Sequence, residues 1–226
     1  MYRLVHLISR WTKPVKTNIV LVGIKMDQPA RASRGRPRTF DVDEALDRAL
    51  KVFWKKGYQS TSLPDLTRAM AINRPSLYAA FGDKQALFCK ALQRYSEQRA
   101  AFLQEALAAP TAREVARRIL HGAINAHATT GDPPGCMIVR GSFSCGDSPT
   151  IRRRLASHRS ATESLIAQRF TRALREGDLP AGASPQDLAR YLMTVLHGLA
   201  VQSSGNASRA QLLRVADTAL RAFPAC

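Results

Sequence analysis

Hydrophobic side chains recur every three or four positions along the chain from Thr39 onward, and no stretch alternates convincingly with a period of two. This spacing places apolar residues on one stripe of a helix, so an all-α fold is predicted. Residues 136–145 fit no single element. The expected helices cover residues 42–56, 63–71, 74–81, 84–108, 112–128, 149–176 and 185–202, with a last helix beginning after Ser208.

The first three predicted helices are bounded by residues that begin and end helices. Asp41, Ser62 and Asn73 each stand where a side chain can cap a helix N-terminus. Gly57 and Gly82 stand where helices stop. The second and third helices are short and are separated by a turn of three or four residues. This arrangement predicts a helix-turn-helix.

In a helix-turn-helix, the start of the second helix enters the DNA major groove. Asn73, Arg74 and Ser76 cluster at that start. Arginine pairs with guanine, asparagine with adenine, and serine with base edges or phosphate. Free N–H groups at the helix starts near Ser62 and Asn73 would add phosphate-binding capacity. The alternative for Arg74 is an ordinary solvated surface position.

The charge distribution supports a polyanionic partner. The net charge is +17, and residues 1–38 contain nine Lys or Arg against one acid. Arg34, Arg36 and Arg38 form a basic arm, expected to be disordered, that can enter the minor groove; the alternative is a solvated tail. Residues 1–25 show no sustained period. We hypothesise that Met26 is the natural start and that residues 1–25 are not native.

Other functional classes find little support in the sequence. Four cysteines show no CxxC pair and no metal-ligand spacing, which favours a reducing cytosol and predicts neither metal nor cofactor. No apolar run approaches the roughly 18 residues of a membrane span. The chain contains no P-loop, dinucleotide fingerprint, HExxH or GxSxG motif, so an enzyme is not expected.

Residues 39–88 resemble the DNA-binding head of TetR/AcrR-type regulators. The shared pattern comprises Gly57-Tyr58, Thr61-Ser62, Leu77-Tyr78, Phe81 and the segment from Lys84 to Leu87. The usual turn glycine is Ala71 here. The resemblance implies that three side chains touch phosphates and that one segment faces the groove. The phosphate contacts are Thr61, Tyr78 and Lys84, and the groove-facing residues are Asn73, Arg74, Pro75, Ser76 and Leu77. The alternative for Tyr78 is a core aromatic, and Leu77 is expected to lie in the core more readily than at the DNA.

The resemblance also implies the organisation of the whole chain: an arm over residues 1–38, a three-helix head over 39–86, and a helical effector-binding and dimerisation domain over 87–226. In this family the last two helices pair with those of a second copy, and the wide apolar face of helix 185–202 agrees. The implied interface comprises Leu188, Tyr191, Leu192, Val195, Leu196, Leu199, Leu212, Leu213, Ala216 and Leu220. The candidate effector-binding residues, each also explicable as core, are Phe102, His127, Cys136, Met137, Phe143 and His158.

The function implied is that of a homodimeric, sequence-specific transcriptional regulator, a repressor of a palindromic operator. A small-molecule effector would release it by shifting the helix that begins at Lys84. Two alternatives stay open. Cys136 could sense oxidants or electrophiles through its thiol, or the protein could be an architectural DNA-binding protein without a sensor.

Overall fold

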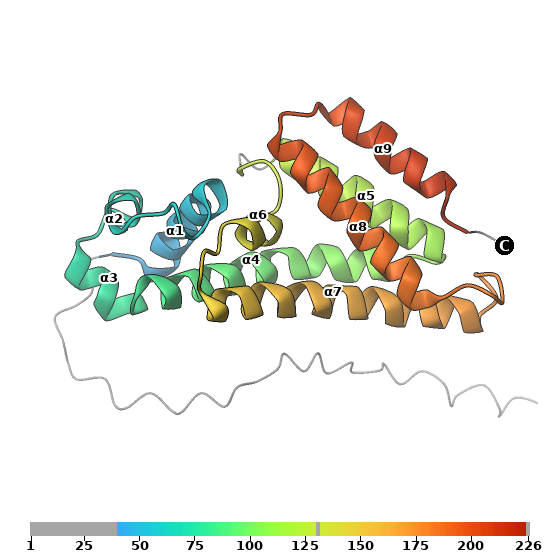
Figure 1. Ribbon diagram of the computed structural model, residues 1–226, viewed down its shortest axis with the longest axis horizontal. Helices are drawn as coiled ribbons and strands as arrows, with labels where there is room; N and C mark the ends of the chain where they lie inside the picture. Colours follow the sequence, from blue (N-terminus) through green and yellow to red (C-terminus); the bar gives the residue numbers. More distant parts are fainter. Residues whose placement is uncertain (1–39, 130–131, 225–226) are drawn as a thin grey trace, which may run out of the picture. The chain divides into compact units, whose positions relative to one another are not determined.

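The computed structural model describes residues 40–129 and 132–224, except for the side chains of residues 127–129. Every regular element in these ranges is a helix, which confirms the all-α prediction (Figure 1). The basic arm with Arg34, Arg36 and Arg38 lies outside the described residues. The helices are α1 (Val42–Lys56), α2 (Leu63–Met70), α3 (Arg74–Phe81), α4 (Lys84–Leu107), α5 (Ala112–Thr129), α6 (Met137–Phe143), α7 (Pro149–Arg175), α8 (Pro185–Ser204) and α9 (Arg209–Arg221).

The first three helices begin at the capping residues that the sequence predicts. The Asp41 carboxylate accepts hydrogen bonds from two backbone N–H groups of the first turn of α1. Ser62 and Asp65 form a reciprocal capping box at α2, and Asn73 accepts the Ser76 N–H at α3. Ala71 ends α2 in the left-handed region with φ 55. A residue with a Cβ costs roughly 1–2 kcal/mol in that conformation, which explains why glycine is usual there.

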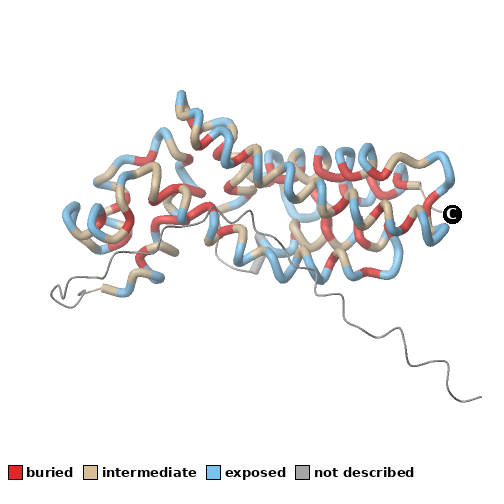
Figure 2. Tube along the Cα trace, turned by 90° about the horizontal axis from the view of Figure 1, so that it is seen from below, coloured by how far each residue is buried: buried red, intermediate tan, exposed pale blue. Residues whose placement is uncertain are grey.

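Two apolar clusters hold the chain together. One lies under the predicted DNA-binding head and joins α1, α2 and α3 to the first half of α4, to α6 and to the start of α7. The other is built from α5, α8 and α9 with the second halves of α4 and α7. The buried positions line the inward sides of the helices (Figure 2). Helices α4 and α7 therefore run through both clusters and connect them mechanically.

The head cluster extends beyond the three helices of the head. Phe88 of α4 packs edge to face on Phe53 of α1 with ring centroids 5.1 Å apart. Met137 of α6 and Ile151 of α7 are buried in the same cluster. A movement of α4 or α6 would therefore displace side chains that pack on α1. None of the helices within the described ranges combines the length and apolarity needed to span a membrane.

Candidate nucleic-acid interface

The start of α3 is exposed, and two of its polar side chains keep groups that can donate hydrogen bonds to a ligand. Asn73 caps the helix by accepting the Ser76 N–H at 2.8 Å, so its side-chain NH₂ group is left to donate. Arg74 and Pro75 are exposed, and Arg74 has no ion-pair or hydrogen-bond partner among the described residues. Leu77 is fully buried in the head cluster instead of facing outward. The polar residues at this end are therefore free to bind, while Leu77 anchors the helix, contrary to its predicted groove-facing role.

Tyr78 and Lys84 lie near the two ends of the turn that joins α3 to α4. The Tyr78 side chain is 48% exposed, which rules out the alternative that it is a core aromatic. The Lys84 Nζ lies 4.6 Å from the centroid of the Tyr58 ring and donates to the Gln59 carbonyl at 3.5 Å. Burial lowers the pKa of the Lys84 ammonium. An anion beside Lys84 would favour its charged form.

Thr61 does not have the predicted exposure. Its side chain is buried, and its Oγ1 donates to the Gly57 carbonyl at 2.6 Å. The hydroxyl is thus committed inside the head and cannot reach a phosphate. Thr61 has a structural role here, because its hydroxyl closes the turn between α1 and α2.

The N-terminus of α2 is also less available than expected. The Asp65 carboxylate accepts hydrogen bonds from the Ser62 N–H and hydroxyl, and Lys56 Nζ lies 2.6 Å from it. The hydrogen bond from Lys56 holds the pKa of this carboxyl well below its usual range. The N–H groups of Ser62 and Asp65 are engaged in the capping box, so they are not free to bind a phosphate. Ser62 is exposed, but it is engaged in the capping box.

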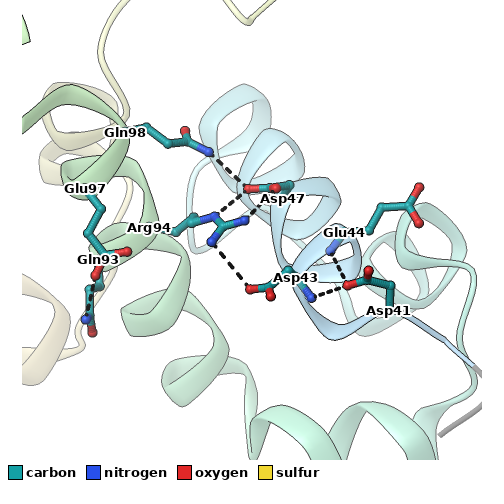
Figure 3. Close-up of polar contacts among 8 residues, drawn as sticks. All are labelled: Asp41, Asp43, Glu44, Asp47, Gln93, Arg94, Glu97 and Gln98. Carbon is teal, nitrogen blue, oxygen red and sulfur yellow. Dashed lines mark hydrogen bonds and ion pairs between the residues drawn. The ribbon is translucent and has the colours of Figure 1, made fainter. Parts of the chain in front are cut away.

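An ion-pair network fastens α1 of the head to α4 (Figure 3). The Arg94 guanidinium donates through Nε and Nη2 to the two carboxylate oxygens of Asp47, each at 3.0 Å. Gln98 also donates to Asp47, at 3.1 Å, and Asp43 lies 3.4 Å from Arg94 Nη1. The hydrogen bond from Arg94 lowers the pKa of Asp47. We call Asp47, Arg94 and Gln98 the α1–α4 clamp.

Comparison with known proteins identifies the family. The model of bacterial regulatory proteins of the tetR family matches residues 45–90. The HTH-type transcriptional repressor ComR of Escherichia coli (strain K12) is 34% identical over 200 residues, which is 87% of this chain and 95% of ComR. The chain belongs to the TetR family.

Further relatives agree with this placement. The HTH-type transcriptional repressor BdcR of Escherichia coli (strain K12) is 30% identical over 187 residues, 82% of this chain and 90% of BdcR. A cysteine mutant of the TetR family transcriptional regulator CifR, solved with 26bp double-strand operator DNA, is 40% identical with a TM-score of 0.80. The match covers 84% of this chain and 100% of that chain. This TetR-family chain is a DNA-binding transcriptional regulator.

In this TetR-family chain α6 is fastened to the turn between α1 and α2. The Gln59 N–H donates to the Ser144 carbonyl at 2.9 Å, and Arg140 Nη1 donates to the Lys55 carbonyl at 3.0 Å. Gly57, with φ +77, packs so closely on Ser144 that a Cβ added there would overlap the Ser144 hydroxyl. Sequence reasoning missed this joint, because residues 136–145 carry no clear helical period. The signal that could have found it is the pair of glycines at positions 57 and 146, since Gly146 packs on the Gln59 side chain.

The candidate effector-binding residues do not gather around one cavity. Phe143 is 82% exposed, and Phe102 is 37% exposed and covers Gly122 of α5. Met137 is buried in the head cluster. Both rings lie at the surface, so the expectation that they could be core residues is wrong, and their role in effector binding stays a prediction. The side chain of His127 lies outside the described residues.

Cys136 and His158 are half-buried and hydrogen-bonded. Tyr95 Oη donates to Cys136 Sγ at 3.3 Å, and Ser96 Oγ lies 3.1 Å from His158 Nδ1. Burial, followed by the nearby charge of Arg154, lowers the pKa of His158 and favours its neutral form. Both pairs involve residues of α4, and Tyr95 and Cys136 also belong to or pack against the head cluster.

The predicted dimer residues fall into two groups. Four are half-buried and Tyr191 is 37% exposed, so these five are available to a partner. The other five are buried in the chain's own core and were wrongly predicted as interface, because the larger apolar stripe of each helix packs internally. The available residues are Leu188, Tyr191, Val195, Leu196 and Leu213, and the buried ones are Leu192, Leu199, Leu212, Ala216 and Leu220.

Proposed function

We propose that this regulator is a homodimeric repressor that binds a palindromic operator through the start of α3 and leaves it when a small molecule binds. The observation that carries this proposal is the exposed pair Asn73 and Arg74 at the start of a helix anchored by the buried Leu77; Asn73 uses its side-chain oxygen as the helix cap and keeps its NH₂ group to donate. The pairing of arginine with guanine and asparagine with adenine supports base reading. The names of ComR and BdcR, both transcriptional repressors, support the sign of regulation.

Phosphate contacts would flank the base-reading residues. Tyr78 has an exposed hydroxyl, and Lys84 is held on the Tyr58 ring with its ammonium near the surface. The charge of Lys84 would release a counterion when it meets a phosphate, so operator affinity should fall steeply with salt. Thr61 is omitted from this set because its hydroxyl is buried. The arm residues Arg34, Arg36 and Arg38 would add minor-groove contacts.

An exposed stripe of α8, which shares only Tyr191 with the predicted interface, supports the dimer. Tyr191, Thr194, Gly198 and Val201 follow each other at intervals of three or four and are all exposed. Nothing lies within 4 Å of the position a Cβ would take on Gly198, which leaves room for the close approach of a second helix. Val215 of α9 is 51% exposed and is, like Val201, a large apolar side chain at the surface. A two-fold dimer through this face would place two α3 helices on a palindromic site.

Release would travel through two connections. The α1–α4 clamp transmits a shift of α4 to α1, and the α6 joint transmits a shift of α6 to the turn that precedes α2. A coupling of about 1–3 kcal/mol would lower operator affinity about 5- to 150-fold. A sensing thiol at Cys136 stays a prediction; the hydroxyl of Tyr95 is the group that any reagent at this sulfur would have to displace.

Selection of bound sequences from random double-stranded DNA, followed by binding titrations on the selected site, tests the proposal. Arg74→Ala should weaken binding to the selected site by about 5- to 150-fold and relax preference at one base position in each half. Arg175→Ala is the matched control, because Arg175 is an exposed arginine at the far end of α7. Selection of no palindromic consensus would refute the proposal. An equal loss on random DNA would reassign Arg74 to phosphate binding.

A further inference from the structure

Arg99 of α4 occupies a corner formed by two aromatic rings. The indole of Trp54 and the phenol of Tyr95 meet nearly at a right angle, 87°, with ring centroids 5.0 Å apart. The Arg99 Cζ lies 4.8 Å from the Trp54 ring and 4.2 Å from the Tyr95 ring. Cation–π attraction to both rings fixes the position of the guanidinium without using its N–H groups as hydrogen-bond donors.

Arg99 differs in this respect from the other half-buried arginines of the described chain. Each of those donates to an acceptor in the protein: carboxylates for Arg94 and Arg118, a hydroxyl for Arg159, and backbone carbonyls for Arg140 and Arg169. Arg99 has neither a carboxylate nor a carbonyl within hydrogen-bond distance among the described residues. A half-buried guanidinium whose donors meet no acceptor among the described residues can bind an anionic ligand, because charge-assisted hydrogen bonds to its planar edge are strong and specific.

We propose that Arg99 binds the carboxylate of a small organic acid, and that this acid belongs to the effector class of the regulator. The assignment of this acid as an effector rests on the proposed function, whereas its binding at Arg99 does not depend on that function. The site offers a single cation between two ring faces, which matches a monoanion attached to a flat or apolar body.

The position of the site explains how such a ligand would reach the DNA-binding head. Trp54 belongs to α1 and is fully buried in the head cluster, whereas Tyr95 and Arg99 belong to α4. Tyr95 is hydrogen-bonded to Cys136, the residue directly before α6. An acid bound to the guanidinium therefore touches the point where α1, α4 and the start of α6 meet. A small displacement of Arg99 from the rings would alter the contact between α1 and α4.

Tryptophan fluorescence gives a direct test on the full chain. The protein has two tryptophans, Trp11 and Trp54, so a Trp11→Phe background isolates the ring that Arg99 covers. The probes are the sodium salts of acetate, benzoate and phenylacetate, with benzamide as the neutral counterpart of benzoate and chloride at equal ionic strength as the blank. A saturable change with at least one carboxylate and none with benzamide is expected. Arg99→Gln should weaken that response at least about tenfold, while Arg99→Lys retains part of it.

The controls separate a lost site from a lost fold. Arg175→Gln removes the same charge far along α7 and should leave the fluorescence titration unchanged. Thermal unfolding of Arg99→Gln identifies a folding defect; if this variant is unfolded, the comparison of Arg99→Lys with Arg175→Gln decides. Failure of every carboxylate to act beyond chloride, or an equal response in Arg99→Gln, overturns the proposal.

The same samples distinguish this inference from the proposed function. If the carboxylate that binds also lowers affinity for the selected operator, and Arg99→Gln binds the operator but does not respond, both stand. If the operator is bound normally and no acid changes fluorescence, the anion site is wrong and the regulator function survives. If acids bind at Arg99 but no operator can be selected, the proposed function fails and the site remains.

Discussion

The α1–α4 clamp contributes a coupling energy that can be measured by a double-mutant cycle. The perturbations are Asp47→Asn, which removes the charge and keeps the shape, Arg94→Gln, and the two together. The side chains are 37% and 30% exposed, so solvent screens the pair and a deeply buried value does not apply. Exposed pairs contribute about 0.2–1 kcal/mol, and the two parallel 3.0 Å hydrogen bonds place this pair at the upper end. We expect a coupling of about 1 kcal/mol.

The assay is urea unfolding of the four proteins at one fixed protein concentration, followed by far-UV circular dichroism. A fixed concentration is needed because the stability of a dimer depends on it. Glu44 and Arg48, an i,i+4 pair on α1 with both side chains more exposed, provide the matched control cycle. That cycle should give at most about 0.5 kcal/mol. Equal coupling energies in the two cycles would show that the bidentate geometry between α1 and α4 does not strengthen the ion pair.

The pH dependence of the clamp has a definite sign. The pKa of Asp47 is lowered in the folded protein, first by its hydrogen bond from Arg94. The unfolded carboxyl titrates at about 3.9, so the stabilisation is present above that pH and is lost as pH falls through the lower folded pKa. The coupling should therefore be constant from about pH 7 to about pH 5 and shrink only below about pH 4. Coupling that weakens between pH 7 and pH 5, or that persists after the carboxyl is protonated, refutes the reasoning.

Three further predictions concern DNA affinity, assembly and the α6 joint. Lys84→Gln should reduce the slope of log affinity against log salt by about 0.9, measured by fluorescence anisotropy, and an unchanged slope would exclude a phosphate contact. Gly198→Leu should fill the open space on α8 and shift light-scattering mass toward the monomer; an unchanged mass would place the interface elsewhere. Gly57→Ala should lose at least about 1–2 kcal/mol of unfolding free energy, because φ is positive and the new Cβ would overlap Ser144. Stability equal to the parent protein would contradict that close contact.

Helix boundaries could be predicted where the determinants are local. Asp41, Ser62 and Asn73 cap helices through bonds to residues two or three positions away, so one short window of sequence contains all the partners. Helix α6 could not be predicted in this way. It is seven residues long, begins at Cys136 without a side-chain cap, and is held by the burial of Met137 and by the bond from Arg140 to α1. These contacts lie far away in sequence.

Site residues could likewise be predicted where local sequence determines their exposure, and could not where long-range packing does. The exposed end of α3 follows from its polar residues and its caps, so Asn73 and Arg74 were predictable. The burial of Thr61 was not, because an exposed threonine and one that closes a turn look alike in sequence. On α8 both sides of the helix carry apolar residues. Only the packing shows that Leu192 faces the chain's own core while Gly198 faces outward.

The head is restrained at two places that differ in kind. The α1–α4 clamp consists of long, partly exposed side chains, so it transmits a shift of α4 to α1 only in part, because side-chain rotation absorbs the rest. The α6 joint combines a backbone hydrogen bond from Gln59 to Ser144, a side-chain bond from Arg140 to the Lys55 carbonyl and the close packing at Gly57 and Gly146, so it cannot stretch without breaking the Gln59 to Ser144 bond. A shift of α4 alone would thus leave the turn before α2 held by α6. Under the proposed function, displacement of α3 therefore requires α6 to move with α4 or to release the turn, so a bound effector must influence α6 as well as α4.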